Sequence, residues 1–301
     1  MSDKSIKAGV LFALAAYTMW GIAPLYFKLL TTVPALEILM HRIVWSVLVL
    51  TILVFVRKKF NQVRMAIGNP KVLKVLLLSG FLLACNWLIF IWAVNNDHLL
   101  DASLGYFINP LFNVLLARLF LQESLSRLQL LAVLVALGSV IFLILSHGHV
   151  PWIALILAST FSVYGLLRKK VAVDSMPGLL IESTMLLPFA LIYWLIAETA
   201  SGNMLINTSD LNVTLILAGV VTTAPLLCFT AAARRIRYTT LGFFQYIGPS
   251  IMFVLAVLYY QEPLEPERAL TFILVWVALL IYVYDSLRVY HKSKISIIKP
   301  S

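Results

Sequence analysis

The chain has 301 residues, of which 61% are apolar and only 12% are charged, and its formal net charge is +10. A soluble domain of this size carries about twice that charged fraction, so most of this surface must face lipid. There is no C-x-x-C, no Walker-type glycine loop and no H-E-x-x-H motif, and no polar segment is long enough for a soluble catalytic domain. The composition therefore predicts an all-α integral membrane protein with no metal site and no cofactor.

Ten apolar runs separated by polar breaks approach the roughly 20 residues that a membrane span needs. The first run follows Lys4 and Lys7 and resembles a signal peptide, but it continues to about Leu30, so we interpret it as a membrane helix. The predicted helices cover 7–29, 34–56, 72–93, 101–121, 128–146, 151–167, 178–197, 211–232, 240–260 and 268–287.

The lysine and arginine residues predict the orientation of these helices. With the N-terminus in the cytoplasm, all but three of the 23 lie in or beside loops on that side, the exceptions being Lys28, Arg42 and Arg268. Both termini are therefore predicted inside. The positive charge is then the usual inside bias, aided by contact with anionic membrane lipid, and not a nucleic-acid-binding surface.

Two pairs of segments repeat along the chain. Residues 11–21 resemble 155–165, and INPLFNVLLARLFLQE at 108–123 resembles IGPSIMFVLAVLYYQE at 247–262. Each half then holds five helices, and an odd number inverts the second copy across the membrane. We therefore predict two inverted five-helix repeats, at 1–147 and 148–290, followed by a cytoplasmic tail at 291–301. Proline-interrupted spans at matching places in two halves indicate the binding site of a secondary transporter.

Three segments resemble the RarD-type members of the EamA family, which belongs to the drug/metabolite transporter superfamily. They are WGIAPLYFK at 20–28, LEILMHRIVWS at 36–46, and the long run at 86–123. The resemblance extends along nearly the whole chain and is more specific in the first half. It implies ten helices in two inverted repeats, and a permease of small molecules in a bacterial inner membrane rather than an enzyme.

Arg42 lies near the middle of the second predicted helix, where a charge costs about 2.5–3.5 kcal/mol to insert. We interpret it as the anchor for an anionic or strongly polar group of the substrate; the alternatives are a structural ion pair or snorkelling to the outer interface. Beside it, His41 shares a helical stripe with Glu37 and Trp45. His41 either carries protons or is simply satisfied by Glu37.

Polar residues also surround the two matched prolines. The predicted substrate-binding residues there are Tyr106, Asn109, Gln245 and Tyr246, and the predicted helix breaks are Pro110, Gly248 and Pro249. A proline frees the carbonyl one turn earlier, which can then bind a ligand. The alternative is a packing kink, with the amides joining neighbouring helices.

Two further sites complete the prediction. Asn86 and Trp87 lie midway along the third helix, where they line a cavity or contact other helices and lipid. Glu182 lies near the cytoplasmic start of the seventh helix and is either a gating residue or an interfacial one. Its depth differs from that of Arg42 by roughly 13 Å, which argues against a pair between them. Glu123 and Glu262 end their helices and are expected to cap or gate rather than bind substrate.

These features predict a secondary carrier that moves a small molecule by alternating access. Without an ATP site, uphill transport must draw on an ion gradient or on exchange. A non-transporting sensor or assembly partner is the alternative, but it would not need matched breaks in both halves. A membrane enzyme is disfavoured because the few intramembrane polar residues are scattered.

Overall fold

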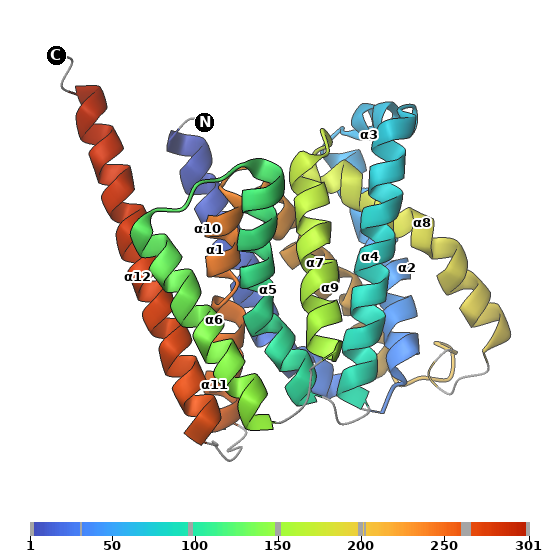
Figure 1. Cartoon of the computed structure of the whole chain (residues 1–301). Coiled ribbons are helices and arrows are strands. Elements are labelled where there is room, and N and C mark those ends of the chain that lie inside the picture. Colours follow the sequence, from blue (N-terminus) through green and yellow to red (C-terminus); the bar gives the residue numbers. More distant parts are fainter. Residues whose placement is uncertain are drawn as a thin grey trace.

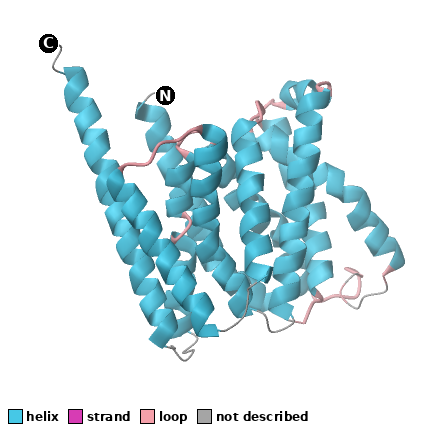
Figure 2. Cartoon of the chain, in the orientation of Figure 1, coloured by secondary structure: helices cyan, strands magenta, loops and turns pink. Residues whose placement is uncertain are grey.

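The computed structural model describes residues 3–30, 32–95, 99–147, 152–197, 201, 203–259 and 266–298. Within these residues the chain is helical with short connections and has no strand (Figure 2). The first half contains α1 (Asp3–Phe27), η1 (Lys28–Leu30), α2 (Ala35–Val56), α3 (Phe60–Ile67), α4 (Pro70–Asn95), α5 (Leu99–Leu121) and α6 (Arg127–His147). The second half contains α7 (Trp152–Lys170), α8 (Ser175–Ile196), α9 (Ser209–Ala233), α10 (Tyr238–Phe244), α11 (Ile247–Val254), the π-helix η2 (Leu255–Tyr259) and α12 (Pro266–Ile298).

The fold is that of an integral membrane protein. Among the described residues, seven helical stretches are long and apolar enough to cross a membrane, and two shorter apolar helices cover Ile108–Leu121 and Ala269–Asp285. Each predicted span overlaps a helix of the structure. However, α7 is neither among the seven long apolar stretches nor one of the two shorter apolar helices. The all-helical membrane class is therefore confirmed, whereas ten crossings in two inverted repeats stay a prediction.

The short helix α3 was not predicted. It lies in a basic connection that was read as a loop, and it packs against α4 and α8. Val63 and Ala66 are buried three residues apart on one face, whereas Phe60 and Met65 are exposed. Eight residues are too few for a membrane span, so an apolar stripe of this length forms a surface helix at the end of the bundle.

The two matched prolines have different effects on their helices. α5 continues through Pro110 without interruption. The ninth predicted span is broken between α10 and α11, where the N–H groups of Gln245 and Tyr246 donate to carbonyls only three residues back. Pro249 is the third residue of α11, and in the first turn of a helix an N–H has no helical partner to lose.

Segments that were predicted on one side of the membrane lie at one end of the bundle. The N-terminus, the C-terminus and α3 are at that end (Figure 1). The Asp174 carboxylate, between α7 and α8, lies 2.8 Å from Lys59 Nζ and 2.7 Å from Arg234 Nη1, so it joins three connections there.

Glu123 caps a helix at the same end. Its carboxylate accepts hydrogen bonds from the backbone N–H groups of Tyr238 and Thr239, at the start of α10. A negative charge at a helix N-terminus is stabilised by the unpaired N–H groups and the helix dipole. The predicted capping role is thus confirmed for Glu123; Glu262 lies outside the described residues.

Small residues bring the inner helices together. α1 packs against α9 and α11, α2 against α8 and α9, and α7 against α4 and α5, while α6 and α12 pair at one edge (Figure 1). A Cβ on Gly219 of α9 would lie 2.5 Å from the carbonyl carbon of Trp45, and one on Gly21 of α1 would lie 2.8 Å from Ile251 Cβ. These close approaches position the walls of the site described next.

Candidate functional site

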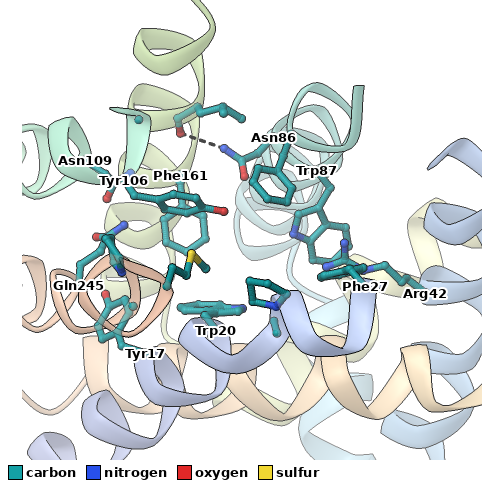
Figure 3. A pocket seen from close by; sticks show the side chains of 18 residues that line it. Tyr17, Trp20, Phe27, Arg42, Asn86, Trp87, Tyr106, Asn109, Phe161 and Gln245 are labelled. Carbon is teal, nitrogen blue, oxygen red and sulfur yellow. Dashed lines mark hydrogen bonds between the residues drawn. The ribbon is translucent and has the colours of Figure 1, made fainter. Parts of the chain in front are cut away.

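A cavity of about 110 Å³ lies among α1, α2, α4, α5, α7 and the break between α10 and α11. It is lined by Tyr17, Trp20, Ala23, Pro24, Phe27, Arg42, Asn86, Trp87, Phe90, Gly105, Tyr106, Asn109, Leu157, Phe161, Gln245, Gly248, Pro249 and Met252 (Figure 3). Most of the wall is aromatic or aliphatic, with a few polar groups placed in it. This composition is typical of a site for a small organic molecule.

Arg42 is at one end of the cavity, beside Trp87 and Phe27 (Figure 3). Its Nε donates to Thr222 Oγ1 of α9 at 2.8 Å, and its guanidinium carbon lies 4.6 Å from the centre of the Trp87 ring. Only 8% of the residue is exposed. In the part of the chain that the structure describes, no carboxylate lies within 4.0 Å of it.

Three amides line the cavity: Asn109 and Gln245 at the end opposite Arg42, and Asn86 between them and Arg42, next to Trp87 (Figure 3). Asn86 Nδ2 donates to the Leu157 carbonyl, and Asn109 Nδ2 donates to the Ala158 carbonyl, each at 2.9 Å. A carbonyl can only accept, so these bonds fix which amide atom is nitrogen and leave Oδ1 of each asparagine as an acceptor. Asn109 Oδ1 is buried and has no partner among the described residues.

Gln245 presents the opposite group. Its Oε1 accepts from Asn113 Nδ2 at 3.1 Å, which leaves the Gln245 Nε2 donors for the cavity. Pro110 and Pro249 have no N–H for the carbonyls four residues earlier, which belong to Tyr106 and Gln245. Both of those residues line the cavity.

The structure brings together most of the residues predicted for the site. Those that line the cavity are Arg42, Asn86, Trp87, Tyr106, Asn109, Gln245, Gly248 and Pro249. Pro110, His41, Tyr246 and Glu182 are not part of its wall. Tyr246 is buried against Phe243 and the α6–α12 side, because the turn at the break directs neighbouring residues to opposite sides.

His41 is buried on a different face of α2. Its Nδ1 accepts from Trp45 Nε1 at 3.2 Å, its Nε2 lies 4.0 Å from Glu37 Oε1, and its ring packs at 4.8 Å from that of Trp194 on α8. Successive residues of a helix point about 100° apart, so the register that aims Arg42 at the cavity turns His41 toward α8. His41 therefore does not line this cavity, and its contact with a substrate stays a prediction.

Glu182 forms an ion pair inside the bundle, and its gating role stays a prediction. It is buried, 3.6 Å from Arg168 Nη1, and accepts a hydrogen bond from the Ser79 hydroxyl. Arg168, counted in the sequence among the charges of a cytoplasmic loop, is fully buried, and its Nη2 donates to the Ser175 carbonyl at 3.1 Å. The pair joins α4, α7 and α8 away from the cavity.

The sequence did not single out most of the aromatic wall. Trp20, Phe27, Phe90 and Phe161 come from three different helices, and their convergence depends on tertiary packing. The one available signal was the presence of Trp20 in the segment 11–21, which resembles 155–165. Thr222, the partner of Arg42, had no sequence signal because the two residues are 180 positions apart.

Comparisons of the sequence with known proteins identify the family of the chain. Residues 7–145 match the EamA-like transporter family. The chain is 51% identical to an "Uncharacterized transporter" of Vibrio cholerae, with 97% of each chain covered. It is 52% identical to "Protein RarD" of Salmonella typhi (95% of this chain, 98% of that one) and 50% identical to "Protein RarD" of Escherichia coli (95% and 97%).

A solved structure described as "Crystal structure of protein" has the same fold, with a TM-score of 0.72 at 15% sequence identity over 94% of this chain and 99% of that one. The fold and the family define a multi-pass membrane permease. The chain belongs to the EamA-like transporter family, as a RarD-type permease. The resemblance noted in the sequence is thereby confirmed.

Proposed function

We propose that this permease is a secondary carrier of the inner membrane, with both termini in the cytoplasm, that moves a small molecule by alternating access. The observation that carries the proposal is a cavity that is lined by helices from both halves of the chain and contains Arg42, a buried arginine with no carboxylate partner among the described residues. A buried charge without a counter-ion is costly in a structural protein but suits a site whose ligand supplies the opposite charge.

The helix contacts support two inverted repeats at 1–147 and 148–290. In an inverted repeat, α1 would match α7, α4 would match α9, and α5 would match the stretch from α10 to η2. The contact of α1 with α9 then has its counterpart in the contact of α7 with α4. In the same way, the contact of α1 with α11 has its counterpart in the contact of α7 with α5. The α2–α8 and α6–α12 contacts each join a helix to its own counterpart in the other half, so the repeat maps each of these contacts onto itself. A pseudo-two-fold axis of this kind lets one half rock against the other around a central site.

Transport by the purified protein tests the carrier function. In liposomes, we expect uptake or exchange of at least one member of a panel of small metabolites and drugs to exceed the rate in protein-free liposomes. The result that rejects the proposal is a rate equal to that of protein-free liposomes for every solute, together with stoichiometric co-purification of a partner protein.

Side-specific labelling tests the inverted repeat. Single cysteines at Ser124 and Glu267, in a protein without Cys85 and Cys228, lie just beyond α5 and at the start of α12. We expect a membrane-impermeant maleimide to reach them from opposite sides of the membrane, because they are in corresponding places of the two halves. Labelling of both from the same side would exclude the inversion.

A further inference from the structure

We infer that the substrate is a small aromatic monoanion, with a carboxylate bound by Arg42, a planar ring held between the aromatic walls, and a neutral hydrogen-bond donor at its far end. The inference rests on the proposed carrier function and names the substrate class of that same cavity. It is carried by the order of chemical groups along the cavity, from Arg42 at one end to Asn109 and Gln245 at the other (Figure 3).

The carboxylate of the inferred substrate is assigned from the hydrogen-bond donors of Arg42. Thr222 occupies only Nε, and the remaining donors of the guanidinium have no partner among the described residues. A planar guanidinium binds a carboxylate through two parallel hydrogen bonds, which a neutral group cannot replace. The Trp87 ring under the guanidinium holds its plane, so the donors are presented in a fixed direction.

The planar ring of the inferred substrate is assigned from the aromatic side chains around the cavity. Trp20 and Phe161 have ring centres 5.6 Å apart, and Phe90 and Tyr106 have ring centres 5.8 Å apart. Ring contacts of this kind favour another aromatic body in stacked or edge-to-face geometry. A strongly hydrated inorganic anion would gain nothing from these walls and would lose its water, so they select against it.

The hydrogen-bond donor at the other end of the substrate is assigned from the orientations of the side-chain amides. Asn109 Oδ1 is an acceptor at that end, and Asn86 Oδ1 is a second acceptor nearer the middle of the cavity. A hydroxyl group can donate to these oxygens, and its own oxygen can accept from Gln245 Nε2. A second carboxylate would face acceptor oxygens and be repelled, so the arrangement selects against dicarboxylates.

Three para-substituted benzene probes separate these requirements in direct binding and transport assays. We expect 4-hydroxybenzoate to quench the tryptophan fluorescence of the purified protein and to be transported in liposomes. We expect 4-hydroxybenzamide, which lacks the negative charge, and terephthalate, which has a second one, to bind about 10–100-fold more weakly, as for loss of a bond to a charged group.

Two arginine variants provide the matched comparison. Arg42→Gln should reduce 4-hydroxybenzoate binding to the level of the amide and leave the amide unchanged. Arg235→Gln is the control, because Arg235 also lies over a ring, 5.3 Å from that of Phe12, but outside the cavity. If Arg42→Gln fails to fold, Arg42→Lys keeps the charge without the planar donors and should give an intermediate affinity.

The outcomes distinguish the two proposals. Binding and transport with the preference described above supports the inference. Transport of neutral, cationic or dianionic solutes without preference for the monoanion overturns the substrate class and leaves the carrier function intact. Transport of no solute at all overturns the carrier function itself.

Discussion

Charged residues inside this protein are of two kinds. Arg168 and Glu182 are paired with each other away from the cavity, and Glu37 lies beside His41 on the α8 side of α2. Arg42 alone among these opens on the cavity and has no acidic partner in the described part of the chain. Their identities could be read from the sequence, but their partners could not, because pairing depends on helix register and tertiary contacts.

Arg168→Met tests the structural pair. The substitution leaves the Glu182 carboxylate buried with only the Ser79 hydroxyl, so we expect a loss of about 3–5 kcal/mol in the free energy of unfolding. Thermal or denaturant unfolding in detergent measures it. The double variant Arg168→Met/Glu182→Leu removes both charges and should recover much of the loss; a double variant no more stable than the single one would refute the pair.

Thr222→Val tests the positioning of Arg42. Valine keeps the shape of threonine but removes the acceptor of the Arg42 Nε bond, and bonds to charged groups contribute about 1.5–3 kcal/mol. We expect the KM for the transported anion to rise about tenfold or more and the melting temperature to fall, because the buried Nε of Arg42 loses its acceptor. Thr223→Val is the control, since Thr223 Oγ1 is buried without a hydrogen-bond partner among the described residues; equal effects of the two substitutions would contradict this role.

At the level of elements, apolar run length predicted where the helices are, because lipid demands about the same length of every span. The difference between α5 and the α10–α11 break was not predictable, since Pro110 and Pro249 occupy matching places in the repeat. What separates them is position within the helix: Pro249 lies in the first turn of a new helix, whereas Pro110 lies inside a continuous one.

Gly219→Ala tests the contact of α2 with α9. An added methyl group would meet the backbone of Trp45 at 2.5 Å, and backbone cannot move aside as a side chain can. We expect destabilisation of about 1–3 kcal/mol or more, together with weaker substrate binding, because the shift separates Arg42 from Thr222. Gly138→Ala on α6 is the matched control, since a Cβ there meets nothing within 4 Å.

At the scale of the whole molecule, the distribution of basic residues predicted which connections share one end of the bundle. The Asp174 contacts with Lys59 and Arg234 bring three of them together as expected. The cavity itself was only partly predictable. Polar residues near the prolines could be identified from their cost in a membrane, but aromatic residues such as Phe161 are equally common facing lipid, so only the packed fold distinguishes them.

Acid titration tests the ion pairs of Asp174 with Lys59 and Arg234. The hydrogen bond from Lys59, aided by Arg234, lowers the pKa of Asp174 to about 2 from its ordinary value of 3.8. Because the folded-state pKa is the lower one, the carboxylate stabilises the fold above about pH 4, and this contribution is lost as the pH falls toward 2. Asp174→Asn should therefore flatten the pH dependence of the melting temperature between about pH 5 and pH 2.

Asp210→Asn is the control for this titration, since Asp210 lies in the first turn of α9 and forms no ion pair with any described residue. An unchanged pH dependence in Asp174→Asn would show that the ion pairs of Asp174 do not contribute to stability.

The central claim is that the cavity is a transport site open to each side of the membrane in turn. Met252 lines it from α11, so a single cysteine at this position, in a protein without Cys85 and Cys228, reports its accessibility. In liposomes treated with an impermeant maleimide on one side at a time, we predict labelling from either side and protection by 4-hydroxybenzoate. A cysteine at Leu258, on the outer surface of the bundle, should stay unlabelled. Labelling of the Met252 position from one side only would contradict alternating access.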